Sequence, residues 1–585
     1  MRPSENHREH SWVRHYNEGV PSTCCYPQCT LPEMLQDSAT RFPHSVALRF
    51  YGTQVTFSEL NDMVTRFAQA LYAIGVRRGD RVAIMLPNIP QAIIGHYGAL
   101  RAGATVVQTN PLYLEQELET QLRDAGAETI LALDLFYPRI QSLKERTSLR
   151  RVITTSIRDF LPAVRRLLYP IKARLSGRWI RVRPAPSLYD FREMLKAMPD
   201  AVDQDGILPV LSPDDLALLQ YTGGTTGTPK GVMLSHRNVM TNAMQCRVWV
   251  PDLQEGREVF LGVIPFFHVY GLSTCQHLAM MTGSALVLLP RFQVKEVLQA
   301  IQTHRVTIFS AIPMMFMKVT ESSEARKYDL RSLRVCLSGA SPLHAEVQDR
   351  FERLTGVKIS EGYGLTEAGP VTHCNPVYGR NPQSSIGVPF PDTETRIVDL
   401  ETGDRVLPVG QAGELTVRGP QIMQGYWNNE KETRDVLRNG WLYTGDVVRE
   451  DTTGFFFLVD RKKDMIKSRG ENVYPRDVEE VLFRHPAVKD AVVVGIPDRH
   501  LGEAVKGYVV LHDGCQITES DLITHCRGVL AAFKVPSHIA FRPELPRTLV
   551  GKVLRRALLN EEAGKNGGDA HAPKPAKQVT VGDAR

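Results

Sequence analysis

Short apolar segments alternate with amphipathic helical segments along most of this 585-residue chain. Residues 82–86 form an apolar strand, residues 91–100 are expected to form a helix, and residues 105–108 form another short strand. Strands that are apolar on both faces are typical of parallel sheets, because each crossover helix packs on a face of the sheet. The sequence therefore predicts an α/β fold with parallel sheets sandwiched by helices. The alternation recurs at Thr129–Leu133, Ala285–Leu289, Thr307–Ala311 and Arg334–Leu337.

Local signals predict where individual helices begin and end. Thr56 and Glu59 have the spacing of a capping box, and Gly75 suits the left-handed residue that ends such a helix. After about Glu561 the chain is rich in Gly, Ala, Lys, Pro and Asp, which predicts a disordered tail. A separate compact unit is predicted from Tyr474, with a helix opened by Pro475, strands at 491–496 and 505–511, and a helix capped by Thr518 and Asp521.

Composition and cysteine spacing exclude several classes of protein. With 43% hydrophobic and 23% charged residues, the chain resembles ordinary globular proteins rather than disordered chains, collagens or membrane bundles. The nine cysteines show no repeated CxxC spacing, which argues against a zinc site or a disulfide framework. The sequence contains no 18-residue apolar stretch and no apolar segment near its N-terminus, so we expect a cytoplasmic protein.

Positive charge is concentrated in one segment. The window 150–183 holds ten Lys and Arg residues against one acidic residue, Asp159, although the net charge of the whole chain is only +6. The remainder is therefore slightly acidic, which argues against a nucleic-acid-binding protein. Apolar residues interleave with these charges, and Pro162 and Pro170 are expected to interrupt any single continuous helix here.

A loop rich in glycine and threonine carries the clearest chemical signal. Between Tyr221 and Gly231, glycines let backbone amides approach an anion, threonine hydroxyls add donors, and Lys230 adds a positive charge. These groups predict a phosphate-binding loop, although the residues on either side of Lys230 exclude the GKS or GKT of a Walker A loop. The candidate phosphate-binding residues are Thr222, Gly223, Gly224, Thr225, Thr226, Gly227 and Lys230.

Five motifs in a fixed order place this loop in a family: QYTGGTTGTPKGVMLSH, PFFHVYG, EGYGLTEA, GWLYTGD and DRKKDMI. Together they resemble the adenylate-forming superfamily, and within it the bacterial long-chain fatty acid–CoA ligases, over about residues 31–559. The resemblance implies a large domain with a β-subdomain and a small α+β domain on a hinge. The expected divisions are an N-terminal extension (1–30), a large AMP-binding domain (31–463), a small domain with a catalytic lysine (464–560) and a tail (561–585).

The resemblance also implies a reaction. Such enzymes use ATP and Mg²⁺ to convert a carboxylic acid into an acyl-adenylate, release pyrophosphate, and then transfer the acyl group to CoA. The expected partners are a medium- or long-chain fatty acid, ATP and CoA. Four alternatives stay open: a CoA ligase for another carboxylic acid, an acyl-AMP ligase that loads a carrier protein, a luciferase-like oxygenase, which shares the nucleotide motifs, and a lipid-binding membrane-surface protein without activity.

The motif EGYGLTEA has a chemical interpretation of its own. Glycines flank Tyr363 and leave its ring open to stacking, while Thr366 and Glu367 supply hard oxygen donors. The resemblance implies that Tyr363 contacts adenine, Thr366 contacts a phosphate and Glu367 binds Mg²⁺. It adds further residues to the ATP site: Gly339, Ala340, Glu361 and Gly362.

Charged residues in the last quarter of the chain complete the implied site. Asp446 and Arg461 match the family's ribose-binding pair, and a carboxylate can accept hydrogen bonds from two vicinal hydroxyls. Lys552, in PRTLVGK, resembles the catalytic lysine. A cation is needed there because a carboxylate must attack a phosphate that is also anionic.

The resemblance further implies a hinge. Lys463 aligns with the hinge residue, and Gly470 aligns with the glycine along which the pantetheine arm of CoA passes. Arg469 stands where many relatives carry a second glycine. The small domain would present Lys552 for adenylation and then turn about the hinge to admit the CoA thiol.

The motif PFFHVYG, residues 265–271, lines the acyl side in relatives, and its apolar character suits an unsubstituted acyl chain. Two interpretations of His268 stay open: a residue at the acyl gate beside the substrate carboxylate, or a packed core histidine. Leu272 stands where some long-chain relatives carry a Trp gate, so chain-length selection by that gate is not predicted.

The basic segment Arg150–Arg183 also has two open interpretations. Its apolar residues have near-helical spacing, so the segment could lie on anionic lipid and hold the enzyme at the inner face of the membrane. The alternative is a surface excursion packed on the large domain. The sequence does not indicate an oligomeric state.

Overall fold

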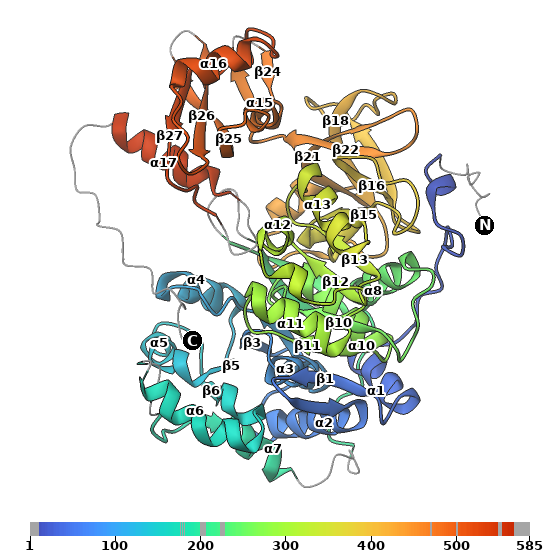
Figure 1. The fold of residues 1–585 in the computed structure, drawn as a ribbon. Helices are drawn as coiled ribbons and strands as arrows, with labels where there is room; N and C mark the ends of the chain where they lie inside the picture. The colour runs from blue at the N-terminus through green and yellow to red at the C-terminus, as the bar shows by residue number, and fades with distance from the viewer. Residues whose placement is uncertain are drawn as a thin grey trace. The chain divides into compact units, whose positions relative to one another are not determined.

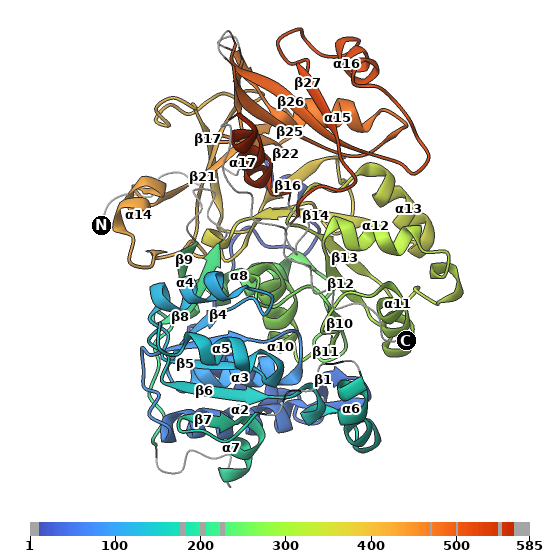
Figure 2. The same ribbon diagram turned by 90° about the vertical axis from the view of Figure 1, so that its left-hand side faces the viewer.

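The structure is a computed structural model. It describes residues 11–175, 177, 180, 182–198, 206–222, 229–468, 471–498, 501–547 and 553–566. The chain divides into two units (Figures 1 and 2). Unit 1 is Met1–Thr395, Thr416–Tyr443 and Thr453–Phe455, and unit 2 is Arg396–Leu415, Thr444–Thr452 and Phe456–Arg585. Three strands contain residues of both units: β17 (Glu394–Val398), β18 (Ala412–Arg418) and β21 (Trp441–Glu450). The domain boundaries expected from the sequence stay predictions.

The first sheet of unit 1 carries the glycine- and threonine-rich loop. Its described strands β8, β4, β3, β5, β6 and β7 run parallel, as the apolar strands predict, whereas β9 joins β8 antiparallel. In spatial order the strands are β19 (Gly425–Tyr426), β9 (Lys230–Ser235), β8 (Leu216–Thr222), β4 (Thr105–Gln108), β3 (Arg81–Met85), β5 (Thr129–Leu133), β6 (Arg151–Thr155) and β7 (Leu188–Asp190).

Helices pack on this sheet as a parallel arrangement requires. Helices α4 (Glu115–Ala125) and α5 (Tyr137–Leu143) lie over the strands of this sheet in Figure 2. Leu118 and Leu122 of α4 and Ile140 of α5 share a core with the strands. Helix α3 (Pro90–Arg101) also approaches closely, because a Cβ at Gly95 would lie 2.4 Å from the Leu131 side chain. Two further helices of this region are α2 (Phe57–Ala73) and α7 (Phe191–Ala197).

The predicted helix signals are confirmed. Thr56 caps α2 through a complete capping box, with the Glu59 amide donating to Thr56 Oγ1 at 3.2 Å and the Thr56 amide donating to Glu59 Oε2 at 2.8 Å. Gly75 follows with φ of +89°, in the left-handed region. The strands predicted at 105–108 and 129–133 are β4 and β5.

The second sheet of unit 1 carries the other nucleotide motifs. Its central strands run parallel, while the pairs β14–β15, β15–β16 and β1–β2 are antiparallel. Its order within unit 1 is β16 (Ser385–Pro389), β15 (Val371–Cys374), β14 (Ile359–Gly364), β13 (Val335–Ser338), β12 (Ile308–Ala311), β10 (Val259–Gly262), β11 (Ala285–Leu288), β1 (Val46–Phe50) and β2 (Thr53–Thr56). Helices of this region are α1 (Leu31–Arg41), α8 (His236–Trp249), α11 (Val294–His304), α12 (Pro313–Glu321) and α13 (Ala345–Thr355).

Unit 2 contains the small sheet and helices predicted from Tyr474 onward. Alternation along β25 directs Ala491 and Val493 into the core beneath α15 and α16, and Val492 and Val494 into a second core with Leu558 of α17. The elements are β23 (Ile466–Ser468), β24 (Glu471–Val473), α15 (Pro475–Phe483), β25 (Val488–Asp498), β26 (Gly502–Leu511), α16 (Glu519–Arg527), β27 (His538–Phe541) and α17 (Arg555–Asn566), after β22 (Phe456–Arg461).

Two segments differ from the sequence-based expectation. Helix α6 (Ala163–Leu175) begins directly after Pro162 but continues through Pro170, which was expected to interrupt it. An internal proline removes a single backbone hydrogen bond, and at a surface helix water can satisfy the released carbonyl. Helix α17 extends to Asn566, past the expected start of the tail, and Glu562 in it accepts a hydrogen bond from Lys506 at 2.7 Å. Residues 567–585 lie outside the described residues.

Candidate active site

The phosphate-binding loop predicted from sequence joins two antiparallel strands. Thr222 ends β8, Lys230 begins β9, and the two residues are paired across the hairpin. A side-chain hydrogen bond fixes the end of β8, because the Tyr221 hydroxyl donates to Asp124 Oδ2 at 2.5 Å. The loop residues Gly223, Gly224, Thr225, Thr226 and Gly227 lie outside the described residues.

A short segment, 423–426, connects this hairpin to the motif that carries Thr366 and Glu367. Tyr426 of β19 pairs with Val232 of β9, two residues after Lys230. The Met423 amide donates to the Glu367 carbonyl at 2.8 Å. The Tyr426 hydroxyl then donates to Glu367 Oε1 at 2.7 Å. The predicted metal ligand is thereby fixed to the strand that begins with the predicted phosphate-binding lysine.

Lys230 contacts the same tyrosine. Its Nζ lies 5.2 Å from the centre of the Tyr426 ring and forms an ion pair with Glu432. Glu432 lies in the first turn of α14 (Glu430–Val436), where Asn429 caps the helix. Burial and the Glu367 carboxylate raise the pKa of Tyr426, so its hydroxyl keeps the proton that it donates. Lys230 and Glu367, which are far apart in sequence, therefore both contact the side chain of Tyr426.

The residues predicted to hold adenine also come together in unit 1. Ser338, the last residue of β13, pairs with Glu361 of β14, so Gly339 and Gly362 lie side by side. A Cβ on Gly339 would lie 3.1 Å from the Tyr270 ring and 3.5 Å from the Gly362 carbonyl. The next residue, Ala340, is exposed and has φ of +71°. Gly339 and Ala340 follow the carboxyl end of β13, the edge at which α/β sheets bind ligands.

Tyr363 is held on β14 by its partner strand. It pairs with His373 of β15, and the two rings meet edge to face with centroids 5.8 Å apart. A Cβ on Gly364 would lie 2.0 Å from the Pro370 carbonyl, so only glycine allows the turn that follows Tyr363. Thr366 and Glu367 come directly after this turn, in a short 3₁₀ helix (Thr366–Ala368).

The motif predicted to line the acyl side, residues 265–271, lies beside β8. The Gln220 side chain donates to the Phe267 carbonyl at 2.8 Å, and Asn88 Nδ2 donates to the Ile264 carbonyl at 2.8 Å. His268 follows with a partly buried side chain, and burial lowers its pKa to about 4. The imidazole is therefore neutral near pH 7. Both interpretations of His268 stay open.

The predicted ribose-binding residues belong to unit 2. Asp446 of β21 and Arg461 of β22 face each other across an antiparallel pair, with Arg461 Nε 3.1 Å from Asp446 Oδ1. The Asp446 side chain is only 6% exposed, whereas the Arg461 side chain is one-third exposed. The guanidinium thus fixes one carboxylate oxygen of Asp446.

Lys463, the predicted hinge residue, follows β22. Desolvation and the neighbouring Arg461 guanidinium lower the pKa of Lys463 to about 8, although part of its surface is exposed. The next residue, Asp464, pairs with Arg555 Nη1 at 3.3 Å. Two predicted residues of this region, Gly470 and Lys552, lie outside the described residues, as does Arg469.

Sequence reasoning missed Tyr426 and Glu432. Their contacts with Glu367 and Lys230 span 59 and 202 positions of sequence, so no local spacing predicts them. A weak signal was present in Gly425-Tyr426-Trp427, where two aromatic residues follow a glycine with φ of +144°. Among the described residues, no group of three His, Cys, Asp or Glu could hold a metal ion, and no helix is both long and apolar enough to cross a membrane.

Two family models and several known proteins match this chain. The AMP-binding enzyme family model matches residues 35–427, and the model of the AMP-binding enzyme C-terminal domain matches residues 477–552. The long-chain-fatty-acid–CoA ligase of Bacillus subtilis (strain 168) is 44% identical over 552 residues, which cover 94% of this chain and 98% of that relative. A protein of the same name from Escherichia coli O6:H1 is 37% identical over 95% of this chain and 98% of its own length.

A solved structure shares the fold as well. The crystal structure of ATP-bound MatB from Rhodopseudomonas palustris has a TM-score of 0.81 and 26% sequence identity, and the likeness covers 92% of this chain and 99% of that one. The fold class predicted from sequence, α/β with parallel sheets and a small C-terminal α+β unit, is confirmed. The chain belongs to the AMP-binding enzyme family.

Proposed function

We propose that this protein is an ATP-dependent fatty acid–CoA ligase for medium- and long-chain acids. It forms an acyl-adenylate with release of pyrophosphate, and then transfers the acyl group to CoA with release of AMP. The observation that carries the proposal is that Lys230 and Glu367 both contact the side chain of Tyr426. Near full-length similarity to two ligases of this name supports the choice of substrate class.

Roles follow for the residues of unit 1. Lys230 and the hairpin loop bind the triphosphate, Thr366 contacts a phosphate, and Tyr363 stacks on adenine. With no three-residue metal cluster among the described residues, Mg²⁺ would take Glu367 and phosphate oxygens as ligands, which suits an ion that usually binds one or two carboxylates. When bound, Mg²⁺ neutralises phosphate charge and so eases attack by an anionic carboxylate.

Unit 2 supplies the remaining roles. Asp446 accepts hydrogen bonds from the ribose hydroxyls, while Arg461 pairs with the Oδ1 atom of Asp446. Lys552 neutralises charge during adenylation, Lys463 serves as the hinge residue, and Gly470 lines the path of the pantetheine arm. Neutral His268 lies on the acyl side of the site, where it does not add charge beside the fatty acid.

A pyrophosphate-release assay on the full chain tests this proposal. Saturated acids from short to long would be supplied with ATP and Mg²⁺, with and without CoA. We expect release to be fastest with medium and long acids, and acyl-CoA to form only with CoA. Absence of AMP formation with every fatty acid would overturn the proposal. Activity with an aryl acid alone, or acyl transfer to a pantetheinylated carrier protein alone, would replace it by one of the alternatives.

The proposal includes a peripheral contact with the membrane. Long-chain fatty acids partition into bilayers, so an enzyme that activates them gains from lying at the membrane surface. The basic segment 150–183 is the part of the chain proposed to make this contact.

A further inference from the structure

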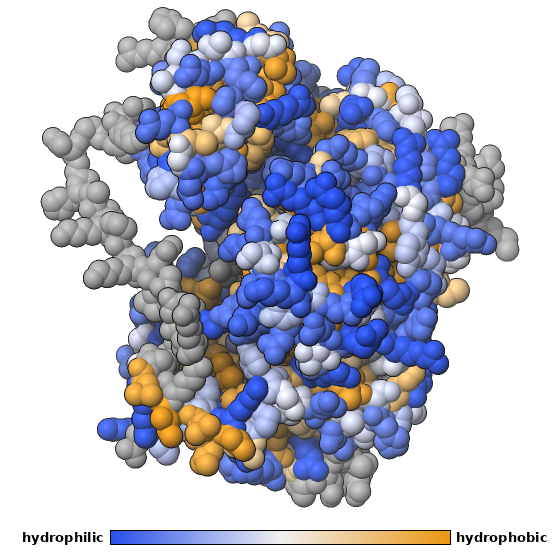
Figure 3. All heavy atoms as spheres, in the orientation of Figure 1, coloured by the Kyte–Doolittle hydropathy of each residue, from blue (hydrophilic) through white to orange (hydrophobic). Residues whose placement is uncertain are grey.

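Helix α6 turns an apolar face toward solvent. Leu175, Leu167 and Val164 are 86%, 77% and 71% exposed, and Leu168 and Ile171 are each more than half exposed. Figure 3 shows a hydrophobic patch, in orange, at the position that α6 occupies at the lower left of Figure 1. Monomeric proteins rarely expose a contiguous apolar patch without using it for binding.

The apolar face is opposite to the side by which α6 packs. At 100° per residue, the five exposed apolar residues fall within an arc of about 100°. Ala173 lies on the far side of the helix and is only 6% exposed. A small residue therefore faces the protein, and the large apolar residues point away from it, which reverses the usual amphipathic arrangement.

Polar bonds, rather than the apolar face, attach this region to the rest of unit 1. The Thr53 hydroxyl donates to the Phe160 carbonyl at 2.7 Å, just before the helix. Arg165 Nη1 donates to the Tyr51 carbonyl at 2.8 Å. The hairpin of β1 and β2 thus holds the beginning of α6, and the apolar face is not used for this attachment.

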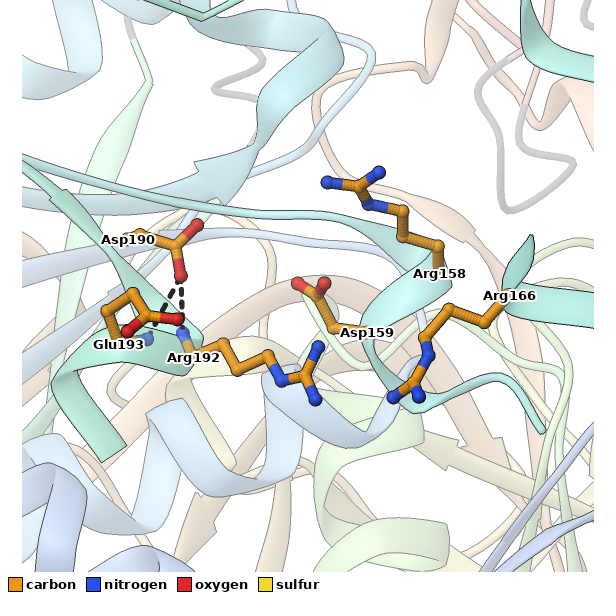
Figure 4. A pocket seen from close by; sticks show the side chains of 6 residues that line it. All are labelled: Arg158, Asp159, Arg166, Asp190, Arg192 and Glu193. Carbon is orange, nitrogen blue, oxygen red and sulfur yellow. Dashed lines mark hydrogen bonds between the residues drawn. The ribbon is translucent and has the colours of Figure 1, made fainter. Parts of the chain in front are cut away.

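Basic residues border the apolar face. On the helical projection, Arg165 and Arg174 lie on its two flanks. Beside the first turn is a polar pocket, and Figure 4 shows Arg166 and Arg192 converging near Asp159. The pocket is lined by Arg158, Asp159, Arg166, Asp190, Arg192 and Glu193.

Two acidic residues of this pocket are already engaged by backbone amides. Asp159 Oδ2 accepts from the Ser156 amide at 2.8 Å, and Asp190 Oδ1 accepts from the amides of Arg192 and Glu193 at 3.0 Å. These bonds partly satisfy the carboxylates, whereas the Arg166 and Arg192 guanidinium groups extend into the pocket. Three guanidinium groups and three carboxylates line this pocket, so it adds no net positive charge beside α6, and the flanking Arg165 and Arg174 carry the charge of the exposed face.

The first residues of the basic segment do not belong to this surface. Arg151 is part of β6, where its Nε donates to the Ile74 carbonyl at 2.8 Å and its Nη1 lies 3.6 Å from Glu128. Arg150 also lies near Glu128. These charges are used within unit 1, so only part of the segment can serve a partner.

We propose that α6 lies in the interfacial region of an anionic phospholipid bilayer. Val164, Leu167 and Ile171 enter the acyl-chain boundary with their apolar neighbours, while Arg165 and Arg174 on the two flanks contact headgroup phosphates. An apolar strip bordered by cations complements this layered chemistry. A second copy of the same face is disfavoured, because it would bring two basic borders together. The inference narrows the membrane contact proposed above to one helix face, and it rests on that part of the proposed function rather than on the ligase chemistry.

Vesicle flotation of the full chain tests the docking surface. Vesicles of phosphatidylcholine alone would be compared with vesicles that also contain phosphatidylglycerol, at low and high salt. We expect binding to the anionic vesicles that weakens as salt screens the arginines. The double variant Leu167→Gln/Ile171→Gln should lower the partition coefficient at least about tenfold. Val210→Gln, which changes an 89% exposed apolar residue outside α6, should leave it unchanged.

Two control measurements on the double variant test folding and catalysis separately. The double variant should retain the wild-type unfolding transition and the wild-type rate of pyrophosphate release with a short, water-soluble acid in the absence of vesicles. Equal vesicle binding by wild type and double variant would overturn the proposal, as would failure of the wild type to bind anionic vesicles. Loss of a concentration-dependent dimer in the variant, without vesicle binding by the wild type, would assign the face to a second copy instead.

Discussion

The Tyr426 hydroxyl lies 2.7 Å from Glu367 Oε1, and this hydrogen bond joins the predicted metal ligand to the strand next to the phosphate hairpin. Tyr426 is 6% exposed, so the bond is sheltered from water. The hydrogen bond engages one carboxylate oxygen of Glu367 and limits rotation of the Glu367 side chain. The second oxygen is directed away from Tyr426. Residues that orient a metal ligand in this way tune the affinity of the site.

Replacing Tyr426 by phenylalanine should weaken the use of Mg²⁺ without removing the metal ligand. Loss of the hydroxyl lets the Glu367 carboxylate rotate, so we expect the Mg²⁺ concentration for half-maximal adenylation to rise by about tenfold or more. Titration of Mg²⁺ in the pyrophosphate-release assay measures this half-maximal concentration. Tyr378→Phe is the matched control, because it removes a hydroxyl bonded to Asp252 at 2.9 Å on an exposed side chain. An unchanged Mg²⁺ dependence in Tyr426→Phe would contradict the role assigned to this bond.

Asp446→Asn should reduce the preference for ATP over 2′-deoxy-ATP. The charged acceptor for the ribose hydroxyls becomes a neutral amide, and hydrogen bonds to charged groups are the stronger ones. We expect the KM for ATP to rise about tenfold, with a smaller rise for 2′-deoxy-ATP. Asp329→Asn changes an exposed carboxylate paired with Arg331 and serves as the control. Equal rises for both nucleotides would show that Asp446 does not bind the ribose 2′-hydroxyl.

The two half-reactions should separate by variant. Lys552→Ala should slow adenylation by about 100-fold or more, because it removes the cation between two anions. Lys463→Ala and Gly470→Ala should mainly slow thioester formation from preformed acyl-adenylate. Single-turnover measurements of each step distinguish these effects. If every variant loses both half-reactions equally, the assignment of one lysine to adenylation and a hinge to the second step is wrong.

The sequence predicts those features that depend on neighbouring residues. Capping by Thr56 and the strands at 105–108 and 129–133 are confirmed because short-range geometry and burial decide them. Thr222 ends β8 and Lys230 begins β9, as the glycine-rich motif between them requires. The roles of these residues stay predictions.

Contacts between distant segments could not be predicted. Glu432 reaches Lys230 across 202 positions, and only the packing of 423–426 beside β9 brings the segments together. The exposure of the apolar face of α6 could not be predicted either, because near-helical spacing alone does not tell which side of a helix faces the protein. Arg150 and Arg151 look like part of one basic surface in the sequence but are used at β6.

Glu432→Gln should tighten ATP binding. Glu432 forms an ion pair with Lys230, so a triphosphate must compete with that carboxylate for the ammonium. Removing the charge leaves the ammonium available to phosphate, so we expect the KM for ATP to fall by about two- to fivefold. The matched control is Glu430→Gln, in the same helix but paired with Arg434 at the surface. A higher KM for ATP in Glu432→Gln would instead show that Glu432 helps to position Lys230.

His236 should make the protein sensitive to acid. The side chain is 2% exposed, its Nδ1 accepts a hydrogen bond from the Leu31 amide at 3.3 Å, and burial lowers its pKa to about 4. Because the unfolded chain has a higher histidine pKa, near 6.5, it binds the proton first as pH falls. This contribution to the free energy of unfolding is therefore complete above about pH 6.5 and is lost toward pH 4, by about 3 kcal/mol.

His236→Asn tests this linkage, because asparagine keeps an acceptor for the Leu31 amide but does not titrate. We expect the variant to lose less stability than wild type between about pH 7 and pH 4.5 in urea unfolding. Some dependence should remain, since burial also lowers the pKa of His277 and of His373 to about 3. Replacement of the exposed His538 by Asn should leave the wild-type pH dependence unchanged. Identical slopes for wild type and His236→Asn would mean that His236 is not the group whose protonation destabilises the fold.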